Sequence, residues 1–269
     1  MLTPERAAHY ERFMQNYEVV RRGESWGADD GAYYRALPFE DRSGRYPDVW
    51  RIRAASFRAL LHEVVQPLAE ARNRPLRILD AGAGNGWLSY RLAQQGHCLL
   101  ATDLRVDALD GLGACLWYME QVTFEAAQAT FEQLPVCDGA LDLVVYGGSI
   151  HYAASYREAL GEALRVLRDD GRIAILDSPV YRQEQSGNEM VSELYEDLRD
   201  SYGIDPRVVA HENFLTPARL DLLERQLGIS WSLIKPFYGW AWALAPWLAR
   251  LQGHREPARF YVIEGRRIS

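Results

Sequence analysis

Residues 77–93 read RILDAGAGNGWLSYRLA, and this stretch decides the fold. A short apolar run ends at Asp80, glycine then occupies every second position from 82 to 86, and an amphipathic helical pattern begins at Trp87. Glycine tolerates positive φ angles and close approach of the backbone to a ligand. The first turn of a helix exposes unpaired N–H groups, and in open α/β sheets ligands bind at the carboxyl ends of the strands. The stretch therefore predicts a strand–turn–helix unit that binds a ligand.

The same alternation of strand and helix patterns continues along the chain. Strand patterns cover 76–82, 97–104, 141–149 and 172–180, and helical patterns cover 87–96, 105–122 and 155–171. This order predicts βαβ units and a mostly parallel sheet with helices on both faces, a doubly wound Rossmann-like α/β fold. Two late strand patterns follow at 230–237 and 259–265.

Segments outside this alternation define the expected domain organisation. Residues 1–74 are predicted to form a helical, aromatic-rich cover, and residues 75–269 to form the main domain with an insertion at about 181–215. The insertion carries a helical pattern at 184–204, and the TPARLDLLERQLG segment at 216–228 begins with a Thr-Pro helix start.

Composition excludes several classes of protein. The 269 residues carry a net charge of -7, and Lys235 is the only lysine, so a nucleic-acid-binding surface is disfavoured. Three cysteines without a CxxC motif give no disulfide framework and no metal pattern, which favours a reducing, cytoplasmic location. The start of the chain lacks the pattern of a signal peptide, and the longest apolar stretch, 236–249, is too short and too interrupted to span a membrane.

The glycine spacing discriminates between two kinds of nucleotide ligand. A dinucleotide site requires G-x-G-x-x-G, but here the third glycine position is occupied by Trp87. Asp80, two residues before the first glycine, would repel a pyrophosphate and suits a ligand with a cationic amino-acid group. S-adenosyl-L-methionine (SAM) has such a group, so the turn favours SAM over a dinucleotide.

Several ordered motifs resemble class I SAM-dependent methyltransferases of the small-molecule, type 11-like group. LDAGAGNG at 79–86 resembles their first motif, and LLATDL at 99–104 resembles their second, an acid at the end of strand 2. Residues 130–153 and 164–179 resemble the stretches around strands 4 and 5. The resemblance covers about residues 76–180 and implies a seven-stranded sheet with an antiparallel last strand. It also implies SAM as cofactor and S-adenosyl-L-homocysteine (SAH) as product.

The resemblance assigns cofactor contacts residue by residue. Asp80 would organise the turn and face the methionine amino group, and Asp103 would accept both ribose hydroxyls. Thr130 stands where the family often has an acid facing the adenine amino group, so its role is open. In the turn, the expected cofactor contacts are Gly82, Ala83, Gly84 and Gly86. Leu104 and Phe131 would contact the adenine, and Tyr146 and Gly147 would line the methionine end.

The acceptor side is less defined. His151 follows strand 4, and it could act as a general base, pack against the next helix or orient the substrate. Asp177 at the end of strand 5 could orient an acceptor or cap a turn. Other candidate substrate contacts are Tyr17, Trp26, Tyr152 and Tyr181. Aromatic residues concentrate in 1–50 and 237–247, where they would either line an acceptor pocket or fix the cover to the core.

Together these features predict an enzyme that transfers a methyl group from SAM to a small-molecule acceptor, mainly by alignment and exclusion of water. A protein methyltransferase and a non-catalytic SAM-binding module are the alternatives. The strand-4 sequence Tyr146-Gly147-Gly148-Ser149 lacks the motif of enzymes that methylate nucleic-acid amines, and Trp87 argues against a nicotinamide-linked oxidoreductase. The acceptor atom and the oligomeric state stay open.

Overall fold

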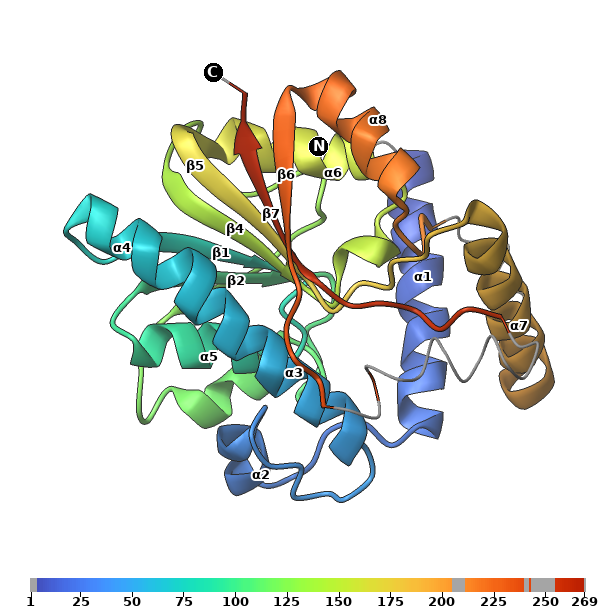
Figure 1. Cartoon of the computed structure of the whole chain (residues 1–269). Coiled ribbons are helices and arrows are strands. Elements are labelled where there is room, and N and C mark those ends of the chain that lie inside the picture. Colours follow the sequence, from blue (N-terminus) through green and yellow to red (C-terminus); the bar gives the residue numbers. More distant parts are fainter. Residues whose placement is uncertain (1–3, 205–210, 240–241, 243–254, 269) are drawn as a thin grey trace.

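Seven strands form one sheet in the computed structural model, which describes residues 4–204, 211–239, 242 and 255–268 (Figure 1). The strand order is β3-β2-β1-β4-β5-β7-β6. Strands β1 to β5 pair in parallel, and β7 is antiparallel to both of its neighbours. The strands are β1 (Arg77–Ala81), β2 (Cys98–Asp103), β3 (Glu125–Gln128), β4 (Leu141–Gly147), β5 (Leu167–Leu176), β6 (Ile229–Ile234) and β7 (Val262–Arg267). This is the Rossmann-like sheet, with an antiparallel last strand, that the sequence predicts.

Helices cover both faces of this sheet (Figure 1). Four helices precede β1: α1 (Pro4–Gly23), α2 (Gly31–Ala36), α3 (Pro47–Leu60) and α4 (Gln66–Arg72), with the π-helical turn η1 (Leu61–Val65) between the last two. The later helices are α5 (Trp87–Gln94), α6 (Tyr156–Val166), α7 (Glu184–Tyr202) and α8 (Pro217–Leu227), and η2 (Leu112–Tyr118) and η3 (Ile150–Tyr152) are 3₁₀ helices. Helix α1 packs beside α7. Among the described residues, none of the helices combines the length and apolar character that crossing a membrane requires.

Two hydrophobic cores follow from the strand alternation. Side chains of successive strand residues point to opposite faces, so Ile78 joins the core under α3 and α5 while Leu79 joins the core under α6 and α8. Both residues are essentially inaccessible to solvent. Burial on both faces explains why β1 and β4 read as nearly continuous apolar runs.

Two of the helices predicted from the sequence differ from the structure. Residues 105–122 form turns and the short 3₁₀ helix η2 instead of an α-helix. Asp107 accepts hydrogen bonds from the N–H groups of Leu109 and Asp110, and Cβ atoms at Gly111 and Gly113 would lie within 3 Å of the preceding turn. Tertiary packing and an Asp-based turn therefore override the helical periodicity.

The helix before strand 5 is also shorter than its pattern predicts. Helix α6 ends at Val166, and β5 begins at Leu167, which pairs with Leu141 across the sheet. The buried side chain of Leu167 completes the core next to α6, so residues 167–171 extend the strand.

Candidate active site

A cleft of about 910 Å³, counting the part open to solvent, lies at the carboxyl ends of β1, β2 and β4. Residues that follow these three strands line it, as the parallel arrangement requires. Its other walls come from α1, α3 and the segment after β3. The cleft-lining residues used below are Tyr10, Phe13, Tyr17, Arg21, Arg53, Gly82, Ala83, Gly84, Asn85, Asp103, Leu104, Arg105, Asp110, Thr130, Phe131, Glu132, Gly147, Gly148, Tyr152 and His211.

The glycine turn exposes backbone without side chains to the cleft. Gly82 has φ +73°, and a Cβ atom there would lie 2.4 Å from the Cβ of Ser149. The Gly82 N–H donates to the carbonyl of Thr102, and the Ser149 hydroxyl donates to the carbonyl of Ala81. These contacts fix the turn between β2 and β4, and any side chain at position 82 would disrupt it.

Asp103 ends β2 and lines the cleft, as predicted for the ribose-binding acid. Its two carboxylate oxygens accept the backbone N–H groups of Gly84 and Arg105, each at 2.8 Å. Burial raises the pKa of Asp103, and these two hydrogen bonds oppose the rise. The carboxylate is therefore held rigidly at the edge of the cleft, with further acceptor capacity for paired hydroxyls.

Asp80 lies behind the turn and does not line the cleft. It is buried, and it accepts hydrogen bonds from the Ser89 backbone N–H at 3.1 Å and the Ser89 hydroxyl at 2.8 Å. Burial raises the pKa of Asp80 to about 7. Asp80 thus organises the turn by tying β1 to α5, while its predicted contact with an amino group remains a prediction.

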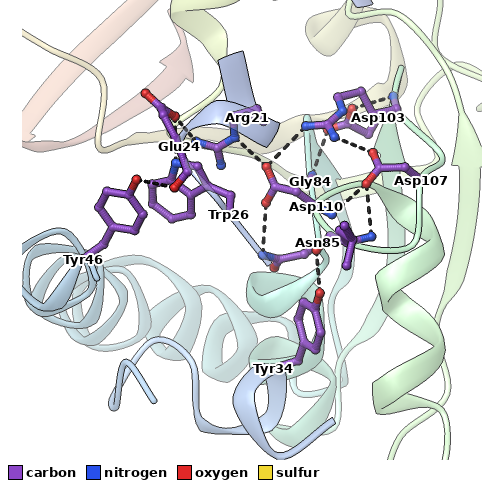
Figure 2. A network of polar contacts seen from close by, with 12 residues as sticks. Arg21, Glu24, Trp26, Tyr34, Tyr46, Gly84, Asn85, Asp103, Asp107 and Asp110 are labelled. Atoms are coloured by element: carbon purple, nitrogen blue, oxygen red, sulfur yellow. Dashed lines mark hydrogen bonds and ion pairs between the residues drawn. The ribbon is translucent and has the colours of Figure 1, made fainter. Parts of the chain in front are cut away.

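A polar network joins α1 to the glycine turn (Figure 2). Arg21 donates to Asp110 at 2.6 Å, Arg105 forms a second ion pair with Asp110 at 3.3 Å, and Asn85 donates to the same carboxylate. Arg21 is largely buried, because its side chain is only 14% exposed and also stacks on Trp26. Arg22 is 75% exposed and pairs only with Glu18 in the described structure.

Two polar atoms without partners lie at the other end of the cleft. The Thr130 hydroxyl and one carboxylate oxygen of Glu132 are buried, and neither has a hydrogen-bond partner within the described structure. The second oxygen of Glu132 accepts from the Tyr10 hydroxyl of α1. Because buried polar atoms are normally satisfied, this pair indicates a position for a polar ligand edge.

Aromatic side chains wall the cleft beside the end of β4. Tyr17 packs edge-on against Tyr152 with ring centroids 5.4 Å apart, and Phe13 contacts Tyr17, Tyr152 and His211. The His211 Nδ1 lies 2.8 Å from the Tyr152 carbonyl, so this nitrogen carries the proton and donates it there. Two predicted substrate contacts, Tyr17 and Tyr152, therefore meet in this wall.

Other predicted site residues lie outside the cleft lining. Tyr146 is fully buried in the core, where its hydroxyl donates to the carbonyl of Ala159, and Gly86 begins α5 against Cys115. Trp26 stacks on Tyr46 behind Arg21, and Tyr181 contacts Phe214 and Arg255. Trp240 and Trp247 of the aromatic segment lie outside the described residues.

His151 and Asp177 lie near one another behind the end of β4. His151 contacts the Ser178 hydroxyl at 3.2 Å, and burial together with the charges of His211 and Arg53 lowers its pKa to about 3. A group with this pKa is neutral at neutral pH, and His151 does not line the cleft, so its role as a base stays a prediction. Asp177 accepts a hydrogen bond from Ser56 and holds a left-handed backbone conformation with φ +51°.

Among the cleft-lining residues that sequence reasoning missed are Arg53, Asp110, Glu132 and His211. Glu132 lies two residues after the position that the family comparison singles out, and that proximity was the available signal. Arg53 and His211 are distant in sequence from any motif, and no local pattern marks Asp110, which follows the 99–104 motif by six residues. In the described residues no group of three or more His, Cys, Asp or Glu side chains is arranged to hold a metal ion.

Comparisons with known proteins agree with this architecture. The model of a family described as "Methyltransferase domain" matches residues 79–175. A Mycobacterium bovis protein described as the uncharacterized methyltransferase Mb3374 is 33% identical over 196 residues, which are 72% of this chain and 68% of that protein.

Solved structures share the fold. YcgJ from Bacillus subtilis has a TM-score of 0.55 at 17% identity, with 72% of this chain and 93% of that one covered. The 1,6-didemethyltoxoflavin-N1-methyltransferase of Burkholderia thailandensis was solved with bound 1,6-didemethyltoxoflavin and SAH. It has a TM-score of 0.54 at 17% identity, and the match covers 100% of this chain and 92% of that one.

The sheet order, the glycine turn and the acid that ends β2 are those of a class I methyltransferase. The chain belongs to the class I SAM-dependent methyltransferases. Its cofactor is S-adenosyl-L-methionine.

Proposed function

We propose that this methyltransferase acts on a small-molecule acceptor held between α1 and the end of β4, with residues 1–74 serving as the cover of the site. The observation that carries this proposal is that Phe13 and Tyr17 of α1 wall the same cleft that contains Asp103. The same cleft would hold the cofactor and the acceptor side by side, with its walls formed by α1, the glycine turn and the end of β4.

On the cofactor side, the proposal assigns the ribose to Asp103 and the close backbone approach to Gly82, Ala83 and Gly84. Leu104 and Phe131 would flank the adenine, and its polar edge would meet Thr130 or Glu132. Glu132 is the better acceptor for an amino group, because a carboxylate oxygen accepts a stronger hydrogen bond than a hydroxyl.

The chain needs to supply little chemistry of its own. When bound, SAM supplies a methyl group on a positively charged sulfur that is already a good leaving group. The aromatic wall of Phe13, Tyr17 and Tyr152 would orient a flat or apolar acceptor and exclude water from the transfer. The Arg21–Asp110 ion pair would hold this wall against the cofactor turn.

Radiolabel transfer tests the acceptor class. The purified enzyme is incubated with SAM labelled on its methyl group and with a cell extract separated into small-molecule and macromolecular fractions. We expect label to enter compounds of the small-molecule fraction, and an Asp103→Ala variant to reduce this incorporation strongly. Label confined to polypeptides would instead support a protein methyltransferase, and SAM binding without transfer to either fraction would support a non-catalytic module.

A further inference from the structure

Arg53 is a cation that lines the cleft. It lies on α3, lines the cleft, and stacks over Trp50 at 4.6 Å and Trp26 at 5.5 Å from the ring centroids. Within the part of the chain that the structure describes, its guanidinium makes no hydrogen bond and no ion pair. It therefore carries five N–H donors without a hydrogen-bonding partner among the described residues.

The other two cleft arginines are different. Arg21 and Arg105 both pair with Asp110, which satisfies their charges within the protein. Burial lowers the pKa of Arg53, which shows that the protein surroundings disfavour its charge, although a guanidinium stays protonated at any physiological pH. Arg53 is partly buried and has no hydrogen-bond partner among the described residues, so its guanidinium is available to bind an anion.

Arg53 lies beside the end of β4, where the proposed acceptor position adjoins the methionine end of the cofactor. A Cβ atom built on Gly148, just after β4, would lie 4.0 Å from one terminal nitrogen of Arg53. Asp177, just after β5, is the strongest charge acting on Arg53, yet its carboxylate accepts its hydrogen bond from Ser56 instead. Asp103, the proposed ribose acid, lies at the end of β2, which is separated from β4 by β1.

We propose that Arg53 binds a carboxylate of the acceptor, so that the substrate class is a small carboxylic acid with a flat or apolar body. A guanidinium matches a carboxylate in a two-point, charge-assisted geometry. The indole rings of Trp26 and Trp50 hold the guanidinium plane, and Tyr17 and Tyr152 provide the wall for the apolar body. This inference rests on the small-molecule function proposed above.

Calorimetric titration with a charged probe and its neutral counterpart tests the assignment. Wild-type protein, Arg53→Gln and Arg53→Lys are first titrated with SAH and then, saturated with SAH, with benzoate and with benzamide. The control is Arg58→Gln, which removes an exposed arginine from the same helix, where it stacks on Phe39 outside the cleft. We expect wild-type and Arg58→Gln to prefer benzoate over benzamide by about tenfold or more, as a charge-assisted contact implies.

In Arg53→Gln we expect this preference to vanish while the affinity for SAH stays within about twofold of wild type, because the lost contact belongs to the acceptor. Arg53→Lys should retain part of the preference. An unchanged preference in Arg53→Gln would overturn the proposal, as would a wild type that does not discriminate between the two probes.

A third outcome would assign Arg53 to the cofactor. If Arg53→Gln binds SAH weakly but binds 5′-methylthioadenosine, which lacks the amino-acid group, as well as wild type does, the bound carboxylate is that of the cofactor and the proposal is wrong. Absence of SAH binding by the wild type would instead overturn the assigned cofactor site, so the two failures are distinguishable.

Discussion

Single residues at the carboxyl edge of the sheet carry the proposed cofactor contacts, and Asp103 is the most constrained of them. Its carboxylate is fixed by two backbone N–H groups and faces the cleft. Replacing Asp103 with alanine should weaken SAH binding by about 1–3 kcal/mol, the usual effect of losing a charged hydrogen-bond partner. Calorimetry measures the affinity, and circular dichroism checks that the variant is folded. Unchanged affinity in a folded variant would refute the ribose assignment.

The buried Asp80 carboxyl predicts how the stability of the folded protein depends on pH. The folded protein holds the Asp80 proton up to about pH 7, whereas the unfolded chain loses it near 3.8. In this window the folded state binds the additional proton, so the free energy of unfolding should fall as the pH rises. Relative to Asp80→Asn, the cofactor-free wild type should lose about 2–3 kcal/mol of stability between about pH 5 and pH 8. Urea denaturation at several pH values measures this difference, and parallel profiles for the two proteins would show that Asp80 is ionised in the folded state.

At the scale of the element, the β1–α5 turn depends on the absence of a side chain. Gly82→Ala places a methyl group 2.4 Å from the Ser149 Cβ at a positive φ, so the turn must shift away from Thr102 and Ala81. We expect a loss of SAH affinity of about tenfold or more, together with lower stability of about 1–3 kcal/mol.

Gly161→Ala is the matched control for this change. Gly161 lies within α6, and a Cβ atom there would meet nothing within 4 Å. Alanine should therefore stabilise the helix by about 0.5–1 kcal/mol and leave SAH binding unchanged. Thermal denaturation and calorimetry measure both variants, and equal effects of the two substitutions would contradict a specific role for the turn.

At the scale of the whole molecule, α1 is held to the cofactor turn mainly through Arg21. Its ion pair with Asp110 is buried, and Asp110 also contacts Asn85 of the turn. Arg21→Gln should increase hydrogen exchange in residues 4–23 by about tenfold and weaken SAH binding, because removing one partner leaves a buried carboxylate less well compensated.

Arg22→Gln provides the comparison one position along the helix. Arg22 is exposed and pairs with Glu18 on the surface, so its removal should change neither the exchange of α1 nor SAH affinity measurably. Mass spectrometry of deuterated peptides reports the exchange. Similar exchange in the two variants would show that α1 is held by its apolar contacts alone.

Site residues could be predicted from the sequence where they belong to a motif of neighbouring residues. Gly82, Gly84 and Asp103 belong to contiguous motifs whose spacing follows from strand and turn geometry, and all three line the cleft. Arg53 lies on a helix before the sheet, and His211 follows the inserted helix α7. Neither has a neighbouring motif, so only the packing of these segments over β4 brings them into the site.

The sequence by itself determined the class of fold, six of the seven strands and the cofactor, because these depend on local periodicity and on a glycine turn that a backbone ligand site requires. Tertiary structure decided the shape of the 105–122 segment, the pairing of Arg21 with Asp110 and the position of Arg53 in the cleft. The physical reason is that burial and pairing of charges arise from contacts between residues far apart along the chain, which no local pattern records.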